Sequence, residues 1–335
     1  MGSRLISIVV PVYDEVDSLD GLVAEIRDVA ARNDLEVEVI LVDDGSRDAS
    51  WERIVSLARN DKRIGGLRFR RNCGKAAALM AGFAVARGNL VFMMDADMQD
   101  PPEEMPRMLA KLDEGFDLVS GWKRIRHDPW HKVYPSRVFN KMIGWLTGVR
   151  LHDHVCGFKV MRREVAKDLR LYGEFHRFIA VFSAARGYRV TEIPTLHRAR
   201  TRGVGKYGLT RFFKGFLDLL TVTTLTRYRW RPQHVIGVTG VVVVLLGAML
   251  PLLAVIAGQM SSELGRLNEW LGRPFETIRG LTAMLAWLLL VLTPGLVLIA
   301  IGLVAELVVA ERPLDRLYEV VEKVGWCAET EPAQG

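Results

Sequence analysis

The stretch VFMMDADMQDPPEEM, residues 91–105, places a dense group of acids directly after an apolar run. The run ends at Asp95, and Asp97 and Asp100 follow within a few residues. A short apolar run bounded by turn residues is typical of a buried strand. Carboxylates gathered where such a strand ends repel one another unless a cation lies between them, so this sequence predicts a polar site at the edge of a sheet.

The residues on either side alternate between strand and helix patterns. Strands are predicted at residues 6–12, 36–43, 66–70, 90–95 and 117–122, with helices at 18–32, 49–60, 74–88 and 103–115. This alternation predicts an α/β fold with a mainly parallel sheet covered on both faces. Ligands of such sheets bind beyond the carboxyl ends of the strands.

Acids follow three of these strands, and turn chemistry alone readily explains only one such site. The pairs are Asp14 and Glu15, Asp43 and Asp44, and Asp95 and Asp97. The last pair and Gln99 offer hard oxygen ligands at alternate positions, which suit Mg²⁺ or Mn²⁺ better than zinc. The chain has no Walker loop or kinase lysine set, and a nucleotide diphosphate lying across the sheet edge fits these acids.

The C-terminal part of the chain has a different composition. Two uncharged apolar runs, residues 235–257 and 281–305, are each long enough to cross a hydrocarbon core of roughly 30 Å. Arginines flank both outer ends, which predicts two membrane spans with both ends inside. The short apolar start of the chain meets acids at once, which favours a strand over an export signal. We therefore expect a multi-pass membrane protein whose N-terminal domain faces the cytoplasm.

The cysteines and the basic residues set further limits. Cys73, Cys156 and Cys327 have no paired or metal-binding spacing and are expected to be free thiols. The net charge of +6 is concentrated in residues 122–141 and 197–214. These runs fit either a solvated surface near lipid headgroups or a site for an anionic substrate. A nucleic-acid binder would explain the basic runs but neither the acids nor the apolar runs.

Four motifs in register resemble family 2 glycosyltransferases of the GT-A fold. They are VVPVYDE, VDDGSRDAS, RNCGKAAALMAGF and DADMQDPPEEMP, and the resemblance extends from residue 5 to about residue 215. Within that family they are most similar to the polyprenyl-phosphate branch, which includes dolichol-phosphate mannose synthase. The two apolar runs suit the same branch.

The resemblance implies roles for the residues of these motifs. Those implied to hold the nucleotide, or its diphosphate, are Pro11, Tyr13, Glu15, Asp43, Lys75 and Asp95. Asp95, Asp97 and Gln99 match the element that binds a divalent metal, Mg²⁺ or Mn²⁺, together with the sugar diphosphate. Asp97 and Gln99 are the expected direct ligands.

The resemblance also assigns the basic side of the site. Lys123 and Arg137 match positions that bind the acceptor phosphate, although an arginine is usual at the first of them, and a lysine lacks its planar fork. Arg177 would face the diphosphate or the acceptor, in a segment where Ala180 replaces a proline. Arg200 and Lys206 match a basic loop over the donor in which Gly205 replaces a serine. The implied catalytic set is Asp97, Arg137, Arg177, Arg200 and Lys206.

The predicted organisation is a catalytic domain at residues 1–206, an amphipathic interfacial segment at 207–232, two spans within 233–310 and a cytoplasmic tail at 311–335. A core helix is the alternative for the amphipathic segment. The expected reaction is inverting transfer of a sugar from a nucleotide diphosphate, with uracil the favoured base, to an undecaprenyl-type phosphate. Membrane lipids are further partners and no nucleic acid is expected, while the sugar, the polyprenol length and any homo-oligomer stay open.

Two rival functions differ in class. A processive polysaccharide synthase would resemble the pattern Gln-x-x-Arg-Trp, but Thr226 occupies the glutamine position, and two spans are few for a translocating channel. A membrane scaffold on an inactive transferase domain would not need the intact set of Asp95, Asp97 and Gln99.

Overall fold

The structure, a computed structural model, describes residues 4–124, 130–198, 209–227 and 318–329, with single positions between 290 and 308. The chain divides into two compact units, residues 1–226 with 312–335 and residues 227–311. The first unit contains the sheet. The apolar run 235–257 lies outside the described residues, as does most of the run 281–305. Within the parts of the chain that are described, no helix combines the length and the apolar character needed to cross a membrane.

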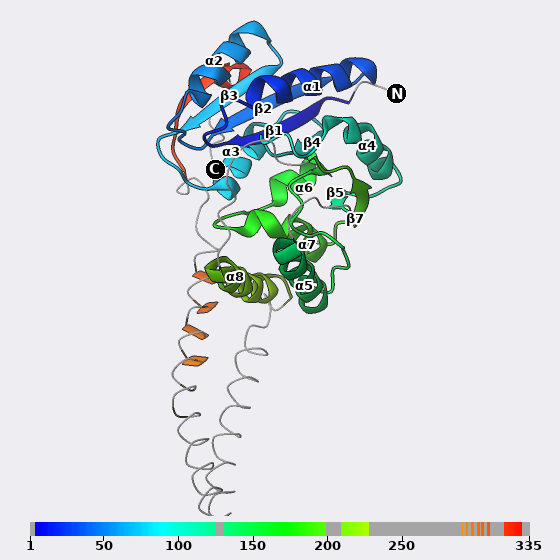
Figure 1. Ribbon diagram of the computed structural model, residues 1–335, viewed down its shortest axis with the longest axis vertical. Helices are drawn as coiled ribbons and strands as arrows, with labels where there is room; N and C mark the ends of the chain where they lie inside the picture. The colour runs from blue at the N-terminus through cyan, green and yellow to red at the C-terminus, as the bar shows by residue number, and fades with distance from the viewer. Residues whose placement is uncertain are drawn as a thin grey trace, which may run out of the picture. The chain divides into compact units, whose positions relative to one another are not determined.

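An eight-stranded sheet forms the centre of the first unit, in the order β7-β5-β6-β4-β1-β2-β3-β8 (Figure 1). The strands are β1 (Ile6–Val12), β2 (Val37–Asp43), β3 (Ile64–Phe69), β4 (Leu90–Met93), β5 (Leu118–Lys123), β6 (Lys159–Arg162), β7 (Val190–Thr195) and β8 (Val320–Gly325). Strands β4, β1, β2 and β3 pair in parallel, as do β5 and β7, whereas β6 and β8 run antiparallel to their neighbours. The predicted mainly parallel α/β sheet is confirmed.

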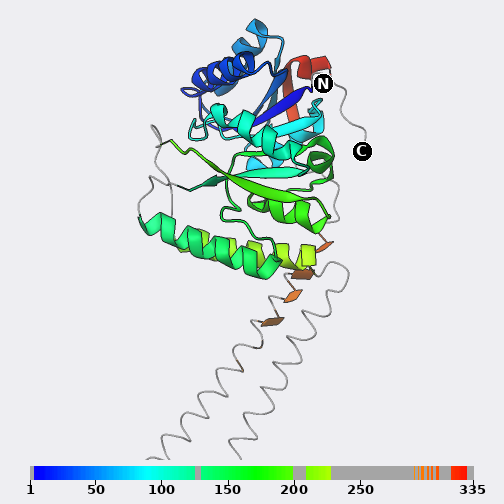
Figure 2. The same cartoon turned by 90° about the vertical axis from the view of Figure 1, so that its right-hand side faces the viewer.

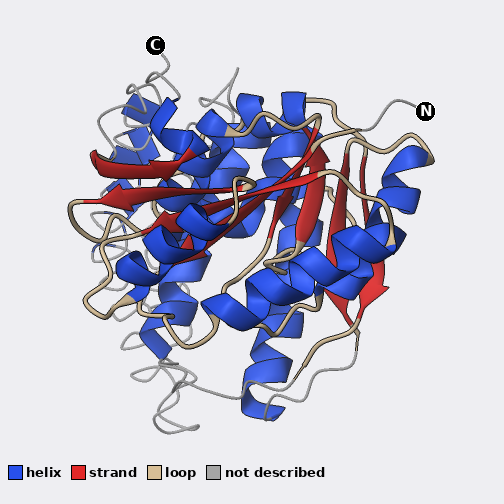
Figure 3. Ribbon diagram, turned by 90° about the horizontal axis from the view of Figure 1, so that it is seen from above, coloured by secondary structure: helices blue, strands red, loops and turns tan. Residues whose placement is uncertain are grey.

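Helices cover both faces of this sheet (Figure 3). They are α1 (Leu19–Arg32), α2 (Ser50–Asn60), α3 (Lys75–Val85), α4 (Met105–Asp113), α5 (Trp130–Thr147), α6 (Arg163–Asp168), α7 (Ile179–Ala185) and α8 (Leu209–Arg227), with 3₁₀ turns η1 (Pro102–Glu104), η2 (Phe175–Phe178) and η4 (Trp326–Glu329). Alternate residues of β1 enter different cores: Ile8 and Val10 pack with α1, α2 and α4, and Val9 packs with α3. Burial on both faces explains why the central strands are almost uniformly apolar.

The pairing register brings the carboxyl ends of the central strands together. Val12 at the end of β1 lies opposite Asp43 at the end of β2, and Val9 lies opposite Met93 at the end of β4. The residues that follow these strands therefore meet at one edge of the sheet, which is where the acids of the sequence lie.

The C-terminal residues return to this sheet as its edge strand. β8 pairs antiparallel with β3, and Figure 1 shows the two side by side. Gly65 and Gly66 of β3 make room for it, since a Cβ at Gly66 would come within 2.7 Å of Val324 and one at Gly65 would collide with Trp326 and Cys327. The expected tail at 311–335 thus contains a strand that the sequence analysis did not predict.

Helix α8 covers the lower side of the domain next to α5 (Figure 2). Its Leu219 and Val222 are fully buried in the core, and Gly215 lies against Phe139 of α5. The same helix pair carries exposed apolar side chains, including Leu217 at 41% and Trp145 of α5 at 80%. One face of the segment expected to be interfacial is therefore part of the domain core.

Candidate active site

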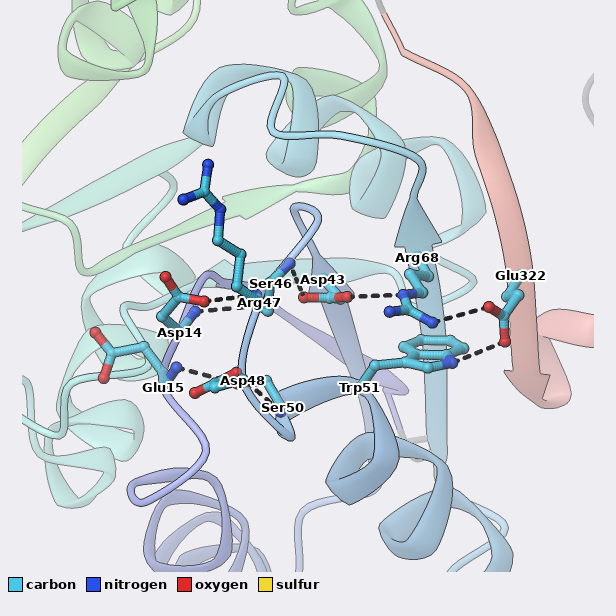
Figure 4. Close-up of polar contacts among 10 residues, drawn as sticks. All are labelled: Asp14, Glu15, Asp43, Ser46, Arg47, Asp48, Ser50, Trp51, Arg68 and Glu322. Carbon is cyan, nitrogen blue, oxygen red and sulfur yellow. Dashed lines mark hydrogen bonds and ion pairs between the residues drawn. The ribbon is translucent and has the colours of Figure 1, made fainter.

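The ends of β1 and β2 are joined through the loops that follow them. The Asp14 amide donates to the hydroxyl of Ser46 at 3.0 Å, and the Arg47 amide donates to the Asp14 carboxylate at 2.8 Å (Figure 4). Asp14 adopts a left-handed backbone conformation, with φ 55°, which is uncommon for a residue with a side chain. Next to it, the Glu15 amide donates to the Ser50 hydroxyl at 3.0 Å. These bonds fix the backbone while the side chain of Glu15 remains partly exposed.

Asp43 and Asp44 are both buried but accept hydrogen bonds from different neighbours. Asp43 accepts a bond from the Ser46 amide at 3.0 Å, and burial raises its pKa against the opposing effects of Ser46 and Arg68. Asp44 accepts from the amides of Cys73 at 2.6 Å and Gly74 at 2.9 Å, directly before α3. Asp44 therefore positions the start of α3, and with it Lys75.

Lys75 reaches from the first turn of α3 to the end of β4. Its ammonium group donates to Asp95 Oδ1 in an ion pair. Burial opposes ionisation of this carboxyl, but Lys75, with a contribution from Lys123, lowers the pKa of Asp95 to about 2. Gly157 lies against the same carboxylate, because a Cβ there would be 2.6 Å from Asp95 Oδ2. Asp95 is thus held ionised and in place from two sides.

Asp97 and Gln99 follow on a turn with a left-handed residue between them. Met98 has φ 57°, a backbone strain that is often found at functional sites. The Gln99 amide donates to Asp97 Oδ1 at 3.2 Å. Burial, followed by the nearby charge of Asp95, raises the pKa of Asp97. The two acids are therefore close enough to repel each other.

The end of β5 joins the same edge through Lys123. Its ammonium group lies 2.8 Å from Asp100, whose side chain is only 1% exposed. Burial opposes the charge, but neighbouring groups that include Asp100 outweigh it and raise the pKa of Lys123. His197 lies 3.9 Å from the same carboxylate. Lys123 is thus charged, pairs with Asp100 and also acts electrostatically on Asp95.

The other predicted residues differ in their exposure, and two of them are not described. Pro11 is half-buried at the end of β1, and the Tyr13 side chain is 40% exposed. Arg177 is buried and pairs with Glu174 at 2.5 Å, and Arg137 is exposed on α5. Arg200 and Lys206 lie outside the described residues.

Several residues of the site escaped the sequence analysis. Lys159 is fully buried on β6, and its ammonium group donates to the carbonyls of His154 and Cys156, in the loop before Gly157. His176 is close to Lys75, and burial together with that ammonium group keeps its pKa well below the usual value. An isolated lysine, glycine or histidine has no local pattern that would reveal these contacts. Asp44, in contrast, belongs to a strand-end pair that the sequence does reveal.

The carboxylates at the end of β4 fit a divalent cation completed by substrate phosphates. The described residues include no group of three or more His, Cys, Asp and Glu side chains that could hold a metal ion alone. Mg²⁺ is commonly held by one or two carboxylates and otherwise by water and phosphate oxygens, so Asp95, Asp97 and Gln99 are a suitable partial set. Burial and then the repulsion from Asp95 raise the pKa of Asp97, and a bound cation would relieve that repulsion.

Comparison with known proteins shows the family to which the chain belongs. The pattern described as "Glycosyl transferase family 2" matches residues 7–170. The chain belongs to this family and is a glycosyltransferase.

Its relatives include polyprenyl-phosphate enzymes. It is 37% identical over 258 residues to the dodecaprenyl-phosphate galacturonate synthase of Rhizobium johnstonii, covering 76% of this chain and 75% of the relative. It is 32% identical over 301 residues to the undecaprenyl-phosphate 4-deoxy-4-formamido-L-arabinose transferase of Aeromonas hydrophila, covering 82% and 91%. One similar solved structure is glucosyl-3-phosphoglycerate synthase of Mycobacterium tuberculosis, in a complex with Mn²⁺, UDP and glucosyl-3-phosphoglycerate. It superposes with a TM-score of 0.51 at 19% identity, over 67% of this chain and 80% of that one. This likeness confirms the GT-A fold.

Proposed function

We propose that this glycosyltransferase moves a sugar from a nucleotide diphosphate, with UDP the favoured carrier, to an undecaprenyl-type phosphate at the membrane. The observation that carries the proposal is a series of contacts along one sheet edge. Asp14 contacts Ser46, Asp44 positions the start of α3, Lys75 pairs with Asp95, and Lys123 pairs with Asp100. This edge offers cations and carboxylates side by side, as a metal-bound diphosphate requires. The names of both relatives support a polyprenyl phosphate as the acceptor.

On the donor side, the proposed roles follow the order of the strands. Pro11, Tyr13, Glu15 and Asp43 hold the nucleoside at the ends of β1 and β2. Asp95, Asp97 and Gln99 hold the diphosphate through Mg²⁺ or Mn²⁺, and Mn²⁺ with UDP in the mycobacterial structure is consistent with this choice. When bound, the cation supplies charge stabilisation to the departing diphosphate.

On the acceptor side, an oxygen of the lipid phosphate attacks the anomeric carbon of the sugar. The bond from that carbon to the diphosphate breaks, and the nucleotide leaves with the electron pair, so the anomeric centre is inverted. The phosphate is already anionic near neutral pH, and no strong general base is needed. Lys123 and Arg137 bind the acceptor phosphate in this proposal, and Arg177, Arg200 and Lys206 offset charge around the two anions. Positioning and electrostatics then supply the rate.

The apolar runs and the domain surface support the proposed location. We place residues 235–257 and 281–305 in the inner membrane as two spans, with the catalytic domain on the cytoplasmic side. The exposed Leu217 of α8 and Trp145 of α5 then meet the lipid interface, where amphipathic helices bind. A lipid phosphate is found at that depth.

The test is transfer of label from nucleotide sugars into lipid. Full-length protein in detergent is incubated with undecaprenyl phosphate, Mn²⁺ or Mg²⁺, and a panel of radiolabelled UDP- and GDP-sugars. We expect metal-dependent label in the organic phase from one donor, with loss in Asp97→Ala. Asp113→Ala is a matched control, because that exposed carboxylate on α4 pairs with the exposed Arg4, away from the strand ends. Free sugar without labelled lipid would overturn the acceptor, and absence of nucleotide binding would overturn the whole proposal.

A further inference from the structure

Arg68 on β3 lies between two carboxylates that are far apart in the sequence. Its Nε is 3.4 Å from Oδ2 of Asp43, and its Nη1 is 3.0 Å from Oε1 of Glu322 on β8 (Figure 4). The Asp43 side chain is fully buried, whereas that of Glu322 is 51% exposed. The guanidinium group therefore connects the C-terminal strand to the carboxylate at the end of β2.

Glu322 is held in a single orientation despite its exposure. Its second oxygen accepts a bond from the indole nitrogen of Trp51 at 2.8 Å. Glu322 is also directly opposite Arg68 in the pairing of β8 with β3, the arrangement in which cross-strand side chains interact. The Arg68 guanidinium carbon lies 5.6 Å from the centre of the Trp51 ring. Both Glu322 oxygens thus have donors from the body of the domain.

We propose that Glu322 is a positioning residue for the nucleotide: by holding the outer nitrogen of Arg68, it keeps Nε of that arginine against Asp43. This inference rests on the proposed function, in which Asp43 meets the nucleoside. The free end of an arginine side chain has several rotatable bonds, so without Glu322 the guanidinium group has no described carboxylate other than Asp43 to fix it. Asp43 Oδ2 makes no hydrogen bond to a described residue and has the Arg68 charge 3.4 Å away, so it then loses the fixed position of that charge, while Oδ1 keeps the Ser46 amide.

The role differs from simple attachment of the strand. An exposed ion pair contributes little to stability, and the backbone pairing of β8 with β3 does not depend on this carboxylate. A variant of Glu322 should therefore alter nucleotide affinity more than it alters thermal stability. The nucleoside is remote from the breaking bond, so the change should appear in KM for the donor and leave kcat unaltered.

The chain provides a matched control. Glu319, just before β8, pairs with Arg70 at 2.8 Å and is exposed to a similar degree, 63%. Among the described residues, no hydrogen bond or ion pair connects that pair to Asp43. Glu319→Ala thus removes the same chemistry from the same segment without touching Arg68.

The experiment measures binding of UDP and GDP with Mn²⁺ by calorimetry, and donor KM and kcat, on the full-length protein in detergent. We expect Glu322→Ala to weaken the nucleotide bound by wild type roughly fivefold to tenfold at unchanged kcat. Glu322→Gln, which keeps an oxygen acceptor, should recover part of the affinity, and Glu319→Ala should match wild type. In an Arg68→Lys background, Glu322→Ala should cause no further loss of nucleotide affinity, because the arginine that connects Glu322 to Asp43 is already absent.

The outcomes separate the two proposals. Wild-type affinity in Glu322→Ala, equal weakening in Glu319→Ala, or additive effects of the Glu322 and Arg68 changes would each overturn the positioning role. If Asp43→Asn weakens binding while Glu322→Ala does not, the donor site stands and only the role of Glu322 fails. If Asp43→Asn binds like wild type, the nucleotide assignment itself fails, and the positioning role fails with it.

Discussion

Gly157 provides a sharp test of how closely the site depends on the placement of Asp95. A Cβ added at Gly157 would lie 2.6 Å from Oδ2 and 2.9 Å from Cγ of Asp95, whereas ordinary contacts begin at 3.4 Å. The carboxylate, or the loop that carries Gly157, must therefore move by about 0.8 Å in Gly157→Ala. Lys159 holds the loop by donating to the carbonyls of His154 and Cys156. We therefore expect the Asp95 carboxylate, and not the loop, to move.

A displacement of that size is large for a catalytic group. A shift of about 1 Å can reduce a rate by roughly a hundredfold, so we expect kcat/KM of Gly157→Ala to fall between about tenfold and a hundredfold. The backbone at Gly157 does not require positive φ, so the alanine should not unfold the protein. The assay is label transfer to undecaprenyl phosphate at several Mn²⁺ concentrations, with Tm measured in parallel.

Gly144→Ala is the matched control for that variant. A Cβ at Gly144, within α5, meets only the Val149 carbonyl at 3.4 Å, an ordinary contact, and alanine is the better helix former. We expect wild-type transfer and an equal or higher Tm. Unchanged activity in Gly157→Ala at an unchanged Tm would refute the reasoning, since it would show that the Asp95 position is not critical.

Other contacts of the domain lead to three more predictions. Asp97→Asn should abolish metal-dependent nucleotide binding without lowering Tm, because it removes a charge that Asp95 repels. Calorimetry with and without Mn²⁺ measures the binding, and a lowered Tm would argue for a structural role of Asp97. Burial, together with Lys159, lowers the pKa of the fully buried His154 to about 4. The protein should therefore lose stability as pH falls from 6.5 towards 4, by up to roughly 3 kcal/mol. Urea unfolding at several pH values should show a flatter dependence of stability on pH in His154→Gln, and parallel curves for variant and wild type would contradict this. Gly65→Ala should destabilise the domain by about 1–3 kcal/mol, because the added Cβ would collide with Trp326 and Cys327. An unaltered unfolding midpoint would mean that η4 does not pack against Gly65.

The part of the fold that sequence reasoning predicted depends on local patterns. Strands β1 to β5 and helices α1 to α4 have apolar runs with turn residues between them, and the structure places all of them within a few residues of the prediction. β6 has four residues, and β7 and β8 mix polar and apolar residues without a clear alternation. Their pairing partners are remote in the chain, and β8 in particular pairs with a strand some 250 residues earlier. A local pattern cannot show such a partner.

The candidate site likewise has residues that local sequence patterns predict and contacts that they do not. The carboxylates could be located because each follows a strand of a parallel sheet, and parallel strands end at one edge. The contacts that position them could not be predicted, since Gly157 and Lys159 act on Asp95 from β6 and the loop before it. Arg68 was visible only as part of a predicted strand, and its link to Asp43 depends on packing in three dimensions.

The charges at this edge indicate why a cation should accompany the donor. Lys75 is already paired with Asp95 and Lys123 with Asp100, so each of these ammonium groups is balanced by a carboxylate before any substrate arrives. A diphosphate that displaced either carboxylate would leave that acid without its partner, at the cost of separating an ion pair that is partly buried for Lys75 and Asp95 and largely buried for Lys123 and Asp100. In the proposed site, a divalent ion held by Asp97 and Gln99 would add positive charge without breaking these pairs. We therefore expect that Lys75 alone cannot replace the metal, and that nucleotide affinity without Mn²⁺ or Mg²⁺ is weak even in the intact site.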